Sequence, residues 1–280
     1  MRSVMPLDIY EEIVALRRLG KRAALATIVS RKGSTPRKDP AKMLLCEDGR
    51  QIGSIGGGCI EAEVCREALM VMRTERPVLL SFDLTDDNAE ESAMLCGGIM
   101  EVYVEPITPE PRLYIFGAGH IGQCVAEVAK NIGFTVAVVD DRVKYASPER
   151  FPRADALYVD PWEEAFRKLP INDSSYLLIA TRGHQYDLEC LRFAVKTPAR
   201  YIGLLGSRRK TKLLFEVLER EGVDPANLER VNAPVGIEIG SETPEEIAIS
   251  IAAELVAVRK NLDVRQLRET LRRAKSAAPA

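Results

Sequence analysis

Six residues in the second half of the chain have the types and spacing of a phosphate-binding loop. Gly117, Gly119 and Gly122 form a G-x-G-x-x-G pattern, and His120 is one of its variable positions. The pattern follows an apolar run directly and precedes a helical one, so the loop would join a strand to the N-terminus of a helix. Backbone N–H groups at such a helix start bind the pyrophosphate of a dinucleotide. The sequence therefore predicts a Rossmann-type site.

An acidic residue stands where this kind of site needs one. Asp140 ends the second apolar run, about 20 residues beyond the glycine-rich loop. A carboxylate at that place would accept a hydrogen bond from a ribose 2′-hydroxyl. Asp141 is a less favoured candidate for the same role. Arg142 follows directly and would suit a 2′-phosphate, so NAD and NADP both stay open as ligands.

Two further polar loops follow predicted strands in the same half of the chain. The first contains His184, a candidate acid, base or plain hydrogen-bond donor. The second contains four candidate binding residues: Gly206, Ser207, Arg208 and Arg209. The carboxyl ends of parallel strands meet at one edge of a sheet, so we expect both loops beside the glycine-rich loop. The arginines could clamp a phosphate, or they could form the solvated first turn of a helix.

Candidate thiols lie in the first half of the chain. Gly57 and Gly58 end a run of three glycines before Cys59. Consecutive glycines indicate a backbone shape that a Cβ would forbid. Cys59 would begin a helix, where the helix dipole favours a thiolate. Cys96 stands before two more glycines and is the second candidate, and for both the alternative is a small buried apolar residue.

A third loop of the first half combines glycine, hydroxyl groups and a cation. Its candidate residues are Gly33, Ser34, Thr35 and Arg37. Such a set can cradle a phosphate or another anion. Together with Cys59 and Cys96, it would form an anion site with two soft sulfur ligands.

The elements that must position these loops differ between the two halves. The second half carries apolar runs at 113–116, 135–139, 156–159, 176–180 and 201–205, separated by helical segments. Continuous apolar runs of this kind are typical of a parallel sheet covered on both faces. A capping box from Thr243 to Glu246, with Pro244 at the first helical position, begins a last strong helix. We therefore predict an α/β chain with a C-terminal Rossmann-type parallel sheet domain.

The first half predicts a smaller α/β domain. It shows helical patterns at 8–19 and 60–72, and strand patterns at 23–29, 41–46, 50–52, 78–82 and 99–104. Three prolines within 106–111 predict a linker, because proline lacks the N–H group that helix or sheet needs. The expected organisation is a domain at 1–105, the linker at 106–111, a Rossmann-type domain at 112–260 and a basic tail at 261–280. The tail is interpreted as a surface helix that frays at its end.

Composition excludes several classes of protein. The 280 residues carry 39 Lys plus Arg and 41 Asp plus Glu, a net charge of −2. A nucleic-acid partner is not expected, because such proteins usually show a basic excess. The chain has no apolar stretch of about 20 residues and no signal peptide, so we expect no membrane partner and a cytoplasmic location. The six cysteines would then be mostly reduced thiols, and with two histidines a structural zinc site is not expected.

At these motifs the sequence resembles the XdhC/CoxI family, the accessory proteins of molybdenum hydroxylases such as xanthine dehydrogenase. The resemblance covers about residues 1–260 and is carried by the segments 33–37, 53–61, 96–98, 116–122, 139–142, 201–210 and 236–246. It implies a maturation factor rather than a turnover enzyme, one that binds molybdenum cofactor (molybdopterin), supports its sulfuration and inserts it into a client hydroxylase. A cysteine desulfurase would be a second partner, and a homodimer stays open. Cys59 and Cys96 would be neighbours of the molybdenum or carriers of persulfide sulfur.

Two other classes remain as alternatives. One is an NAD(P)-dependent oxidoreductase with its active site between the two domains, which Gly119 and Asp140 favour. The other is a nucleotide-sensing regulatory domain without chemistry of its own. The identity of the client hydroxylase is not readable from the residues.

Overall fold

The structure, a computed structural model, describes residues 8–33, 41–83 and 98–277. The chain divides into two units, residues 1–110 and 111–280, and each is described by itself. Hydrophobic clusters form separately inside each unit.

The sheet of the first unit is antiparallel. Its five described strands lie in the order β3-β2-β1-β5-β4. Their bounds are β1 (Ala23–Gly33), β2 (Lys42–Cys46), β3 (Gln51–Gly53), β4 (Val78–Asp83) and β5 (Gly98–Ile107). Side chains alternate between the two faces, so Ala24 and Met43 belong to one hydrophobic cluster while Leu25 and Leu44 belong to another.

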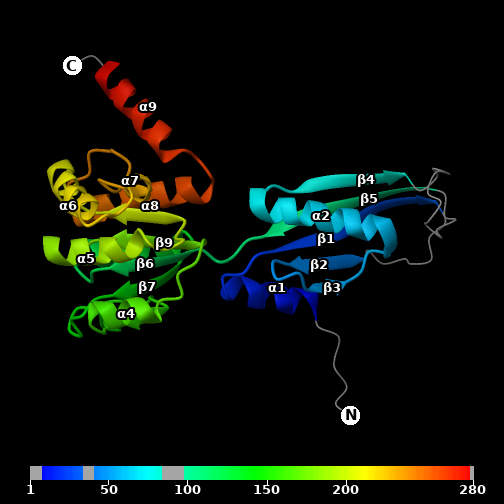
Figure 1. Cartoon of the computed structure of the whole chain (residues 1–280), viewed down its shortest axis with the longest axis horizontal. Coiled ribbons are helices and arrows are strands. Elements are labelled where there is room, and N and C mark those ends of the chain that lie inside the picture. Colours follow the sequence, from blue (N-terminus) through cyan, green and yellow to red (C-terminus); the bar gives the residue numbers. More distant parts are fainter. Residues whose placement is uncertain (1–7, 34–40, 84–97, 278–280) are drawn as a thin grey trace, which may run out of the picture. The chain divides into compact units, whose positions relative to one another are not determined.

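In the described residues, two helices cover these two faces. Helix α2 (Gly58–Thr74) places Val64, Ala68 and Val71 on the first cluster. Figure 1 shows α2 lying along this sheet. Helix α1 (Ile9–Arg18) places Leu16 on the second, and Asp8 caps it by accepting from the N–H of Tyr10 at 2.8 Å. The first unit is thus a small α/β layer structure.

Proline does not end the last strand of the first unit where the sequence suggested. β5 continues through Pro106 to Ile107, with Pro106 opposite Ala24 of β1. The pairs between β4 and β5 begin only at Val104, so at Pro106 the described sheet has a neighbour on one side. A missing N–H is tolerated at such a place. The stretch without regular structure is therefore 108–111, shorter than the linker expected at 106–111.

The sheet of the second unit is parallel and has six described strands, in the order β11-β10-β9-β6-β7-β8. The bounds are β6 (Arg112–Phe116), β7 (Thr135–Val139), β8 (Ala156–Tyr158), β9 (Ser175–Ile179), β10 (Tyr201–Leu204) and β11 (Val231–Asn232). This is the doubly wound order of the Rossmann fold, in which all strands run parallel and the order of strand addition reverses between β6 and β9. The predicted fold class is confirmed.

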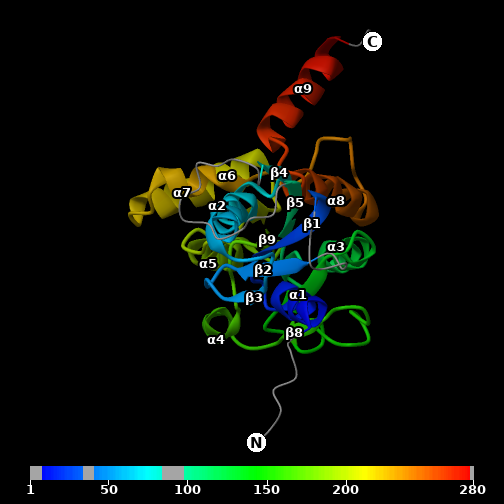
Figure 2. The same ribbon diagram turned by 90° about the vertical axis from the view of Figure 1, so that its right-hand side faces the viewer.

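Helices cover both faces of this sheet. Helices α3 (His120–Asn131) and α8 (Pro244–Arg259) pack on one face, and the capping box at Thr243 is present. The opposite face carries α4 (Trp162–Lys168), α5 (His184–Ala194), α6 (Arg208–Arg220) and α7 (Pro225–Glu229). Figure 2 shows α3 and α8 on one side of this sheet and α4, α5 and α6 on the other. No helix of the described residues has the length and apolar character to cross a bilayer.

Helix α9 (Val264–Ala277) occupies the segment that was interpreted as a surface helix, and it also contacts the core. Figure 1 shows it extending away from the second unit's sheet, but its base is anchored in the core. Arg268 forms an ion pair with the fully buried Glu254 of α8 and donates to the carbonyl of Pro234 at 2.9 Å. Tyr201 of β10 donates to the same carboxylate at 2.6 Å. The first turns of α9 therefore complete the polar core of the second unit.

Candidate functional site: a glycine-rich loop at the carboxyl edge of the parallel sheet

The glycine-rich loop is shaped by close approaches of backbone to backbone. Gly117 has φ +116°, and a Cβ there would lie 2.2 Å from the carbonyl oxygen of Ala180 at the end of β9. A Cβ at Gly122 would lie 2.3 Å from the carbonyl oxygen of Gly117. Side chains at these two positions would push the loop off the sheet and off α3. The first and third glycines of the pattern are therefore required for packing.

Gly119 differs from the other two glycines. It is the N-cap of α3, and among the described residues nothing lies within 4 Å of a Cβ built there. His120, the first residue of α3, is exposed. The unpaired N–H groups of the first helical turn open onto this free space, which suits a phosphate. The loop thus fits the anionic group of a nucleotide or of molybdopterin.

Asp140 is buried and fully engaged by the protein itself. Only 1% of the residue is exposed, and its carboxylate accepts from the N–H of Ala118 at 2.8 Å. Arg142 supplies three more donors: its backbone N–H at 3.1 Å, and Nε and Nη2 at 2.8 Å each. A carboxylate has about four acceptor positions. A ribose hydroxyl would therefore have to displace Arg142, and the ribose contact of Asp140 stays a prediction.

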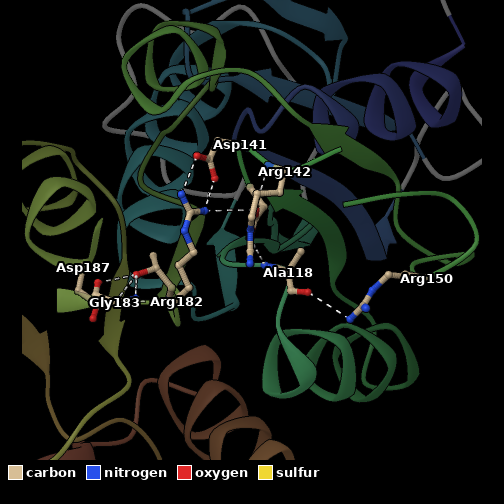
Figure 3. A network of polar contacts seen from close by, with 9 residues as sticks. Ala118, Asp141, Arg142, Arg150, Arg182, Gly183 and Asp187 are labelled. Carbon is tan, nitrogen blue, oxygen red and sulfur yellow. Dashed lines mark hydrogen bonds and ion pairs between the residues drawn. The ribbon is translucent and has the colours of Figure 1, made fainter. Parts of the chain in front are cut away.

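The side chain of Arg182 bridges the two loops that flank the glycine-rich loop. Arg182 follows β9, and its Nη2 donates to Oδ2 of Asp141, after β7, at 2.9 Å, with Nη1 on the second carboxylate oxygen. This hydrogen-bonded pair lowers the pKa of Asp141. Figure 3 shows the side chain of Arg182 reaching Asp141 near Ala118 of the glycine-rich loop. The sequence did not single out Arg182, because the pairing depends on strand order.

Two more arginines flank the same edge. The guanidinium carbons of Arg142 and Arg150 lie 3.8 Å and 5.2 Å from the centroid of the Tyr145 ring. Arg150 also donates to the carbonyl of Ala118 at 3.3 Å (Figure 3). Three cations therefore surround the glycine-rich loop, against the two carboxylates of Asp140 and Asp141.

Helix α5, which follows β9, holds a buried charge that sequence reasoning missed. His184, the first residue of α5, is exposed, with Gly183 as the N-cap. Asp187 is fully buried, accepts from Oγ1 of Thr181 at 2.7 Å and pairs with Lys210. A usable signal existed, because Asp187 shares the buried stripe of α5 with Cys190, Leu191 and Ala194.

The loop after β10 is only partly available for a ligand. Ser207 caps α6 by accepting from the N–H of Lys210 at 3.2 Å, and Lys210 folds back onto Asp187 and the carbonyl of Leu205. Gly206 leaves room for that lysine side chain, which a Cβ would approach to 2.7 Å. Arg208 and Arg209 are exposed. Arg208 also borders a pocket of about 310 Å³ formed mainly by residues 234–241.

In the first unit, a carboxylate folds the glycine turn onto a helix. Gly56, Gly57 and Gly58 all have positive φ, at 134°, 80° and 72°, a region that disfavours side chains. Glu61 of α2 accepts from the N–H of Gly57 and the hydroxyl of Ser54, both at 2.9 Å. Burial raises the pKa of Glu61, but hydrogen bonds from Gln51, Ser54 and the backbone outweigh it and lower the pKa.

The two candidate thiols differ in what can be said of them. Cys59 is exposed and is the second residue of α2. Cys96 lies outside the described residues, as do Ser34, Thr35 and Arg37. Gly33 ends β1 opposite Gly98. Within the described part of the chain, no group of three or more His, Cys, Asp or Glu side chains is placed to hold a metal ion.

An antiparallel α/β unit followed by a Rossmann unit with a glycine-rich loop defines the class of protein. The chain belongs to the XdhC and CoxI family. The family models described as the XdhC Rossmann domain and as the XdhC and CoxI family match residues 113–255 and 16–83. The family expected from the sequence motifs is confirmed.

Several known proteins are similar over most of this chain. An uncharacterized protein YqeB of Escherichia coli is 37% identical over 91% of the chain, which spans only 47% of that relative's length. A protein of Bacillus subtilis, named as a probable subunit of xanthine dehydrogenase, is 28% identical over 86% of this chain and 94% of its own. The molybdenum cofactor insertion chaperone PaoD of Escherichia coli is 23% identical over 86% and 84%. A crystal structure described as a xanthine dehydrogenase from Bacillus halodurans is 26% identical, with a TM-score of 0.51 over 92% of this chain and 97% of that one.

Proposed function

We propose that this chain binds molybdenum cofactor, supports its sulfuration and inserts it into a xanthine dehydrogenase-type molybdenum hydroxylase. The observation that carries the proposal is the continuous similarity, across both units, to a relative named as a molybdenum cofactor insertion chaperone. The client hydroxylase and a cysteine desulfurase are the proposed partners. Both domains, at about 1–105 and 112–260, would take part in this function, in the cytoplasm.

The glycine-rich loop of the second unit supports the phosphate part of this proposal. Molybdopterin ends in a phosphate or a nucleotide, and Gly119 opens the N-terminus of α3 to such a group. Arg208 and Arg209 are exposed at the same carboxyl edge and could contact the rest of the ligand.

The thiols support the sulfur part. Molybdenum binds sulfur ligands readily, and Cys59 is exposed next to a turn of three positive-φ glycines. Cys59, together with Cys96, would lie beside the metal or carry persulfide sulfur. Cys46 and Cys190 are buried, which raises the pKa of both thiols and leaves them less reactive.

Native mass spectrometry of the protein purified from a molybdenum-replete host tests this function. We expect bound pterin in the wild type and a lower fraction of pterin-bound protein in Cys59→Ser. Cys65→Ser, in the same helix, is the matched control. Activation of the apo-hydroxylase by the purified protein is the second measurement. A protein that carries no pterin and activates no hydroxylase would contradict the proposal.

A second candidate function is NAD(P)-dependent oxidoreduction. The specific observation in its favour is the doubly wound strand order with Asp140 at the end of β7. The same mass spectrum would detect a co-purified dinucleotide in place of the pterin.

A further inference from the structure

The pair of Arg182 and Asp141 joins two loops that lie on opposite sides of β6. Arg182 follows β9, Asp141 follows β7, and the strand order β9-β6-β7 puts the glycine-rich loop between them. Nη1 of Arg182 also lies 3.9 Å from Oδ1 of Asp140, whose other oxygen accepts from the N–H of Ala118. The arginine therefore lies at the crevice where the strand order of the sheet reverses. Ligands of this fold bind in that crevice.

The aromatic ring of Tyr186 stacks against the guanidinium of Arg182 and holds it in place. The central guanidinium carbon lies 3.9 Å from the centroid of the Tyr186 ring. Stacking of this kind fixes the plane of the guanidinium and leaves its N–H donors for an anion. The side chains of Arg182 and Asp141 are 29% and 26% exposed, so a ligand in the crevice can reach the pair.

A phosphate group can accept two parallel hydrogen bonds from an arginine, in the same bidentate geometry as a carboxylate. We propose that Arg182 binds the phosphate of the ligand on the glycine-rich loop, and that Asp141 takes the place of that phosphate in the free protein. This inference rests on the proposed function, in which the second unit binds a phosphate-bearing cofactor. Asp140 keeps its place, because its buried carboxylate holds the N–H of Ala118 and positions the loop.

The charges around the loop agree with this exchange. Arg142 and Arg182 pair with Asp140 and Asp141, and Arg150 donates to the carbonyl of Ala118 in the same loop. When Asp141 swings out into water, a phosphate meets three cations and one engaged carboxylate. Asp141 then acts as a competitor that a neutral ligand would not displace, so the site selects for phosphorylated ligands.

Calorimetric titration of the full chain with inorganic pyrophosphate tests the exchange. Arg182→Gln should weaken pyrophosphate binding by roughly tenfold or more, the loss of a charge-assisted contact. Asp141→Asn should tighten it severalfold, because Arg182 is released from its competitor. The double variant should bind as weakly as Arg182→Gln, since nothing remains for the asparagine to release.

A matched control removes an equal charge from an equivalent pair. Arg192 of α5 and Glu221 at the C-cap of α6 also form a bidentate pair, with Nε–Oε2 at 2.5 Å and Nη2–Oε1 at 2.6 Å. This pair lies at the C-terminal ends of the two helices, away from the glycine-rich loop. Glu221→Gln should leave the pyrophosphate affinity unchanged. Equal tightening by Asp141→Asn with and without Arg182, wild-type affinity of Arg182→Gln, or a wild type that binds no pyrophosphate would each overturn the inference.

The pterin measurement separates this inference from the proposed function. Pterin in the wild type together with an unchanged pyrophosphate affinity of Arg182→Gln overturns the phosphate site alone. The predicted pattern with pyrophosphate and no pterin in the wild type overturns the cofactor function and leaves the phosphate site standing.

Discussion

Gly119 borders free space, whereas Gly122, three residues later, is in close contact with backbone. Substitutions at the two positions should therefore affect ligand binding and folding stability separately. Gly119→Val should fold, at a cost of about 1 kcal/mol for a poorer N-cap, and should lose pyrophosphate binding because the side chain enters the free space. Gly122→Val should lower the free energy of unfolding by about 1–3 kcal/mol through overpacking against Gly117. Urea unfolding and calorimetric titration measure the two effects. Undiminished binding by a folded Gly119→Val variant would move the ligand elsewhere.

Glu61 makes the stability of the first unit depend on pH. Its hydrogen bonds lower the pKa of the carboxyl group in the folded state. A depressed carboxyl pKa adds stability that is present above the unfolded value of about 4.3 and is lost as the pH falls through the lower folded value. Glu61→Gln should therefore be less stable at pH 7 and lose less stability between pH 6 and pH 3. Thermal unfolding at several pH values, with the exposed Glu63→Gln as control, gives the comparison; parallel curves for Glu61→Gln and the wild type would refute it.

The residues of the site were predictable only where the signal is local. The glycine spacing predicted the loop at Gly117, and the run before Cys59 predicted a strained turn. Arg182 and Asp141 are 41 positions apart, so their pairing needs the strand order and cannot be read from the sequence. Glu61 was missed although it lies in the first turn of α2, four residues after Gly57, one position beyond that of a capping-box carboxylate.

At the scale of elements, a buried ion pair helps to anchor α9 on the second unit. Arg268→Leu leaves Glu254 charged and unpaired in the core, which should cost about 3–5 kcal/mol of unfolding free energy. Combining it with Glu254→Gln should recover part of that loss, because the glutamine still accepts from Tyr201. Chemical unfolding followed by circular dichroism is the measurement.

The control for this prediction lies on the same helix. Glu269 is exposed and adjacent to Arg268, so Glu269→Gln should be neutral. Equal stability of Arg268→Leu and Glu269→Gln would show that α9 is a surface helix without a stabilising contact to the core.

Element types were read more reliably than element ends. Most predicted strands and helices are present, because their apolar runs are continuous or periodic. β11 was missed because it has two residues, Val231 and Asn232, too few for any pattern. β5 extends beyond its predicted end because Pro106 is paired with β1 but not with β4, and a missing N–H is tolerated there.

For the whole molecule, the separate hydrophobic cores of residues 1–110 and 111–280 predict two unfolding transitions. Arg268→Leu should shift only the transition of the second unit, and Gly57→Val, at a φ of +80°, only that of the first. Differential scanning calorimetry resolves the two. A single transition that both variants shift equally would mean that the units unfold together.

Trp162 turns the second unit into its own optical reporter. It is the only tryptophan of the chain, is 5% exposed, and its indole N–H finds no acceptor among the described residues. Its ring centroid lies 6.2 Å from that of Tyr186, on which Arg182 stacks, and 6.4 Å from that of Phe116, where β6 enters the glycine-rich loop. Light that excites only indole therefore probes this unit alone, and the emission should change in colour or lifetime whenever the guanidinium beside Tyr186 changes partner. The arrival of a ligand can then be timed in a stopped-flow instrument without attaching a dye.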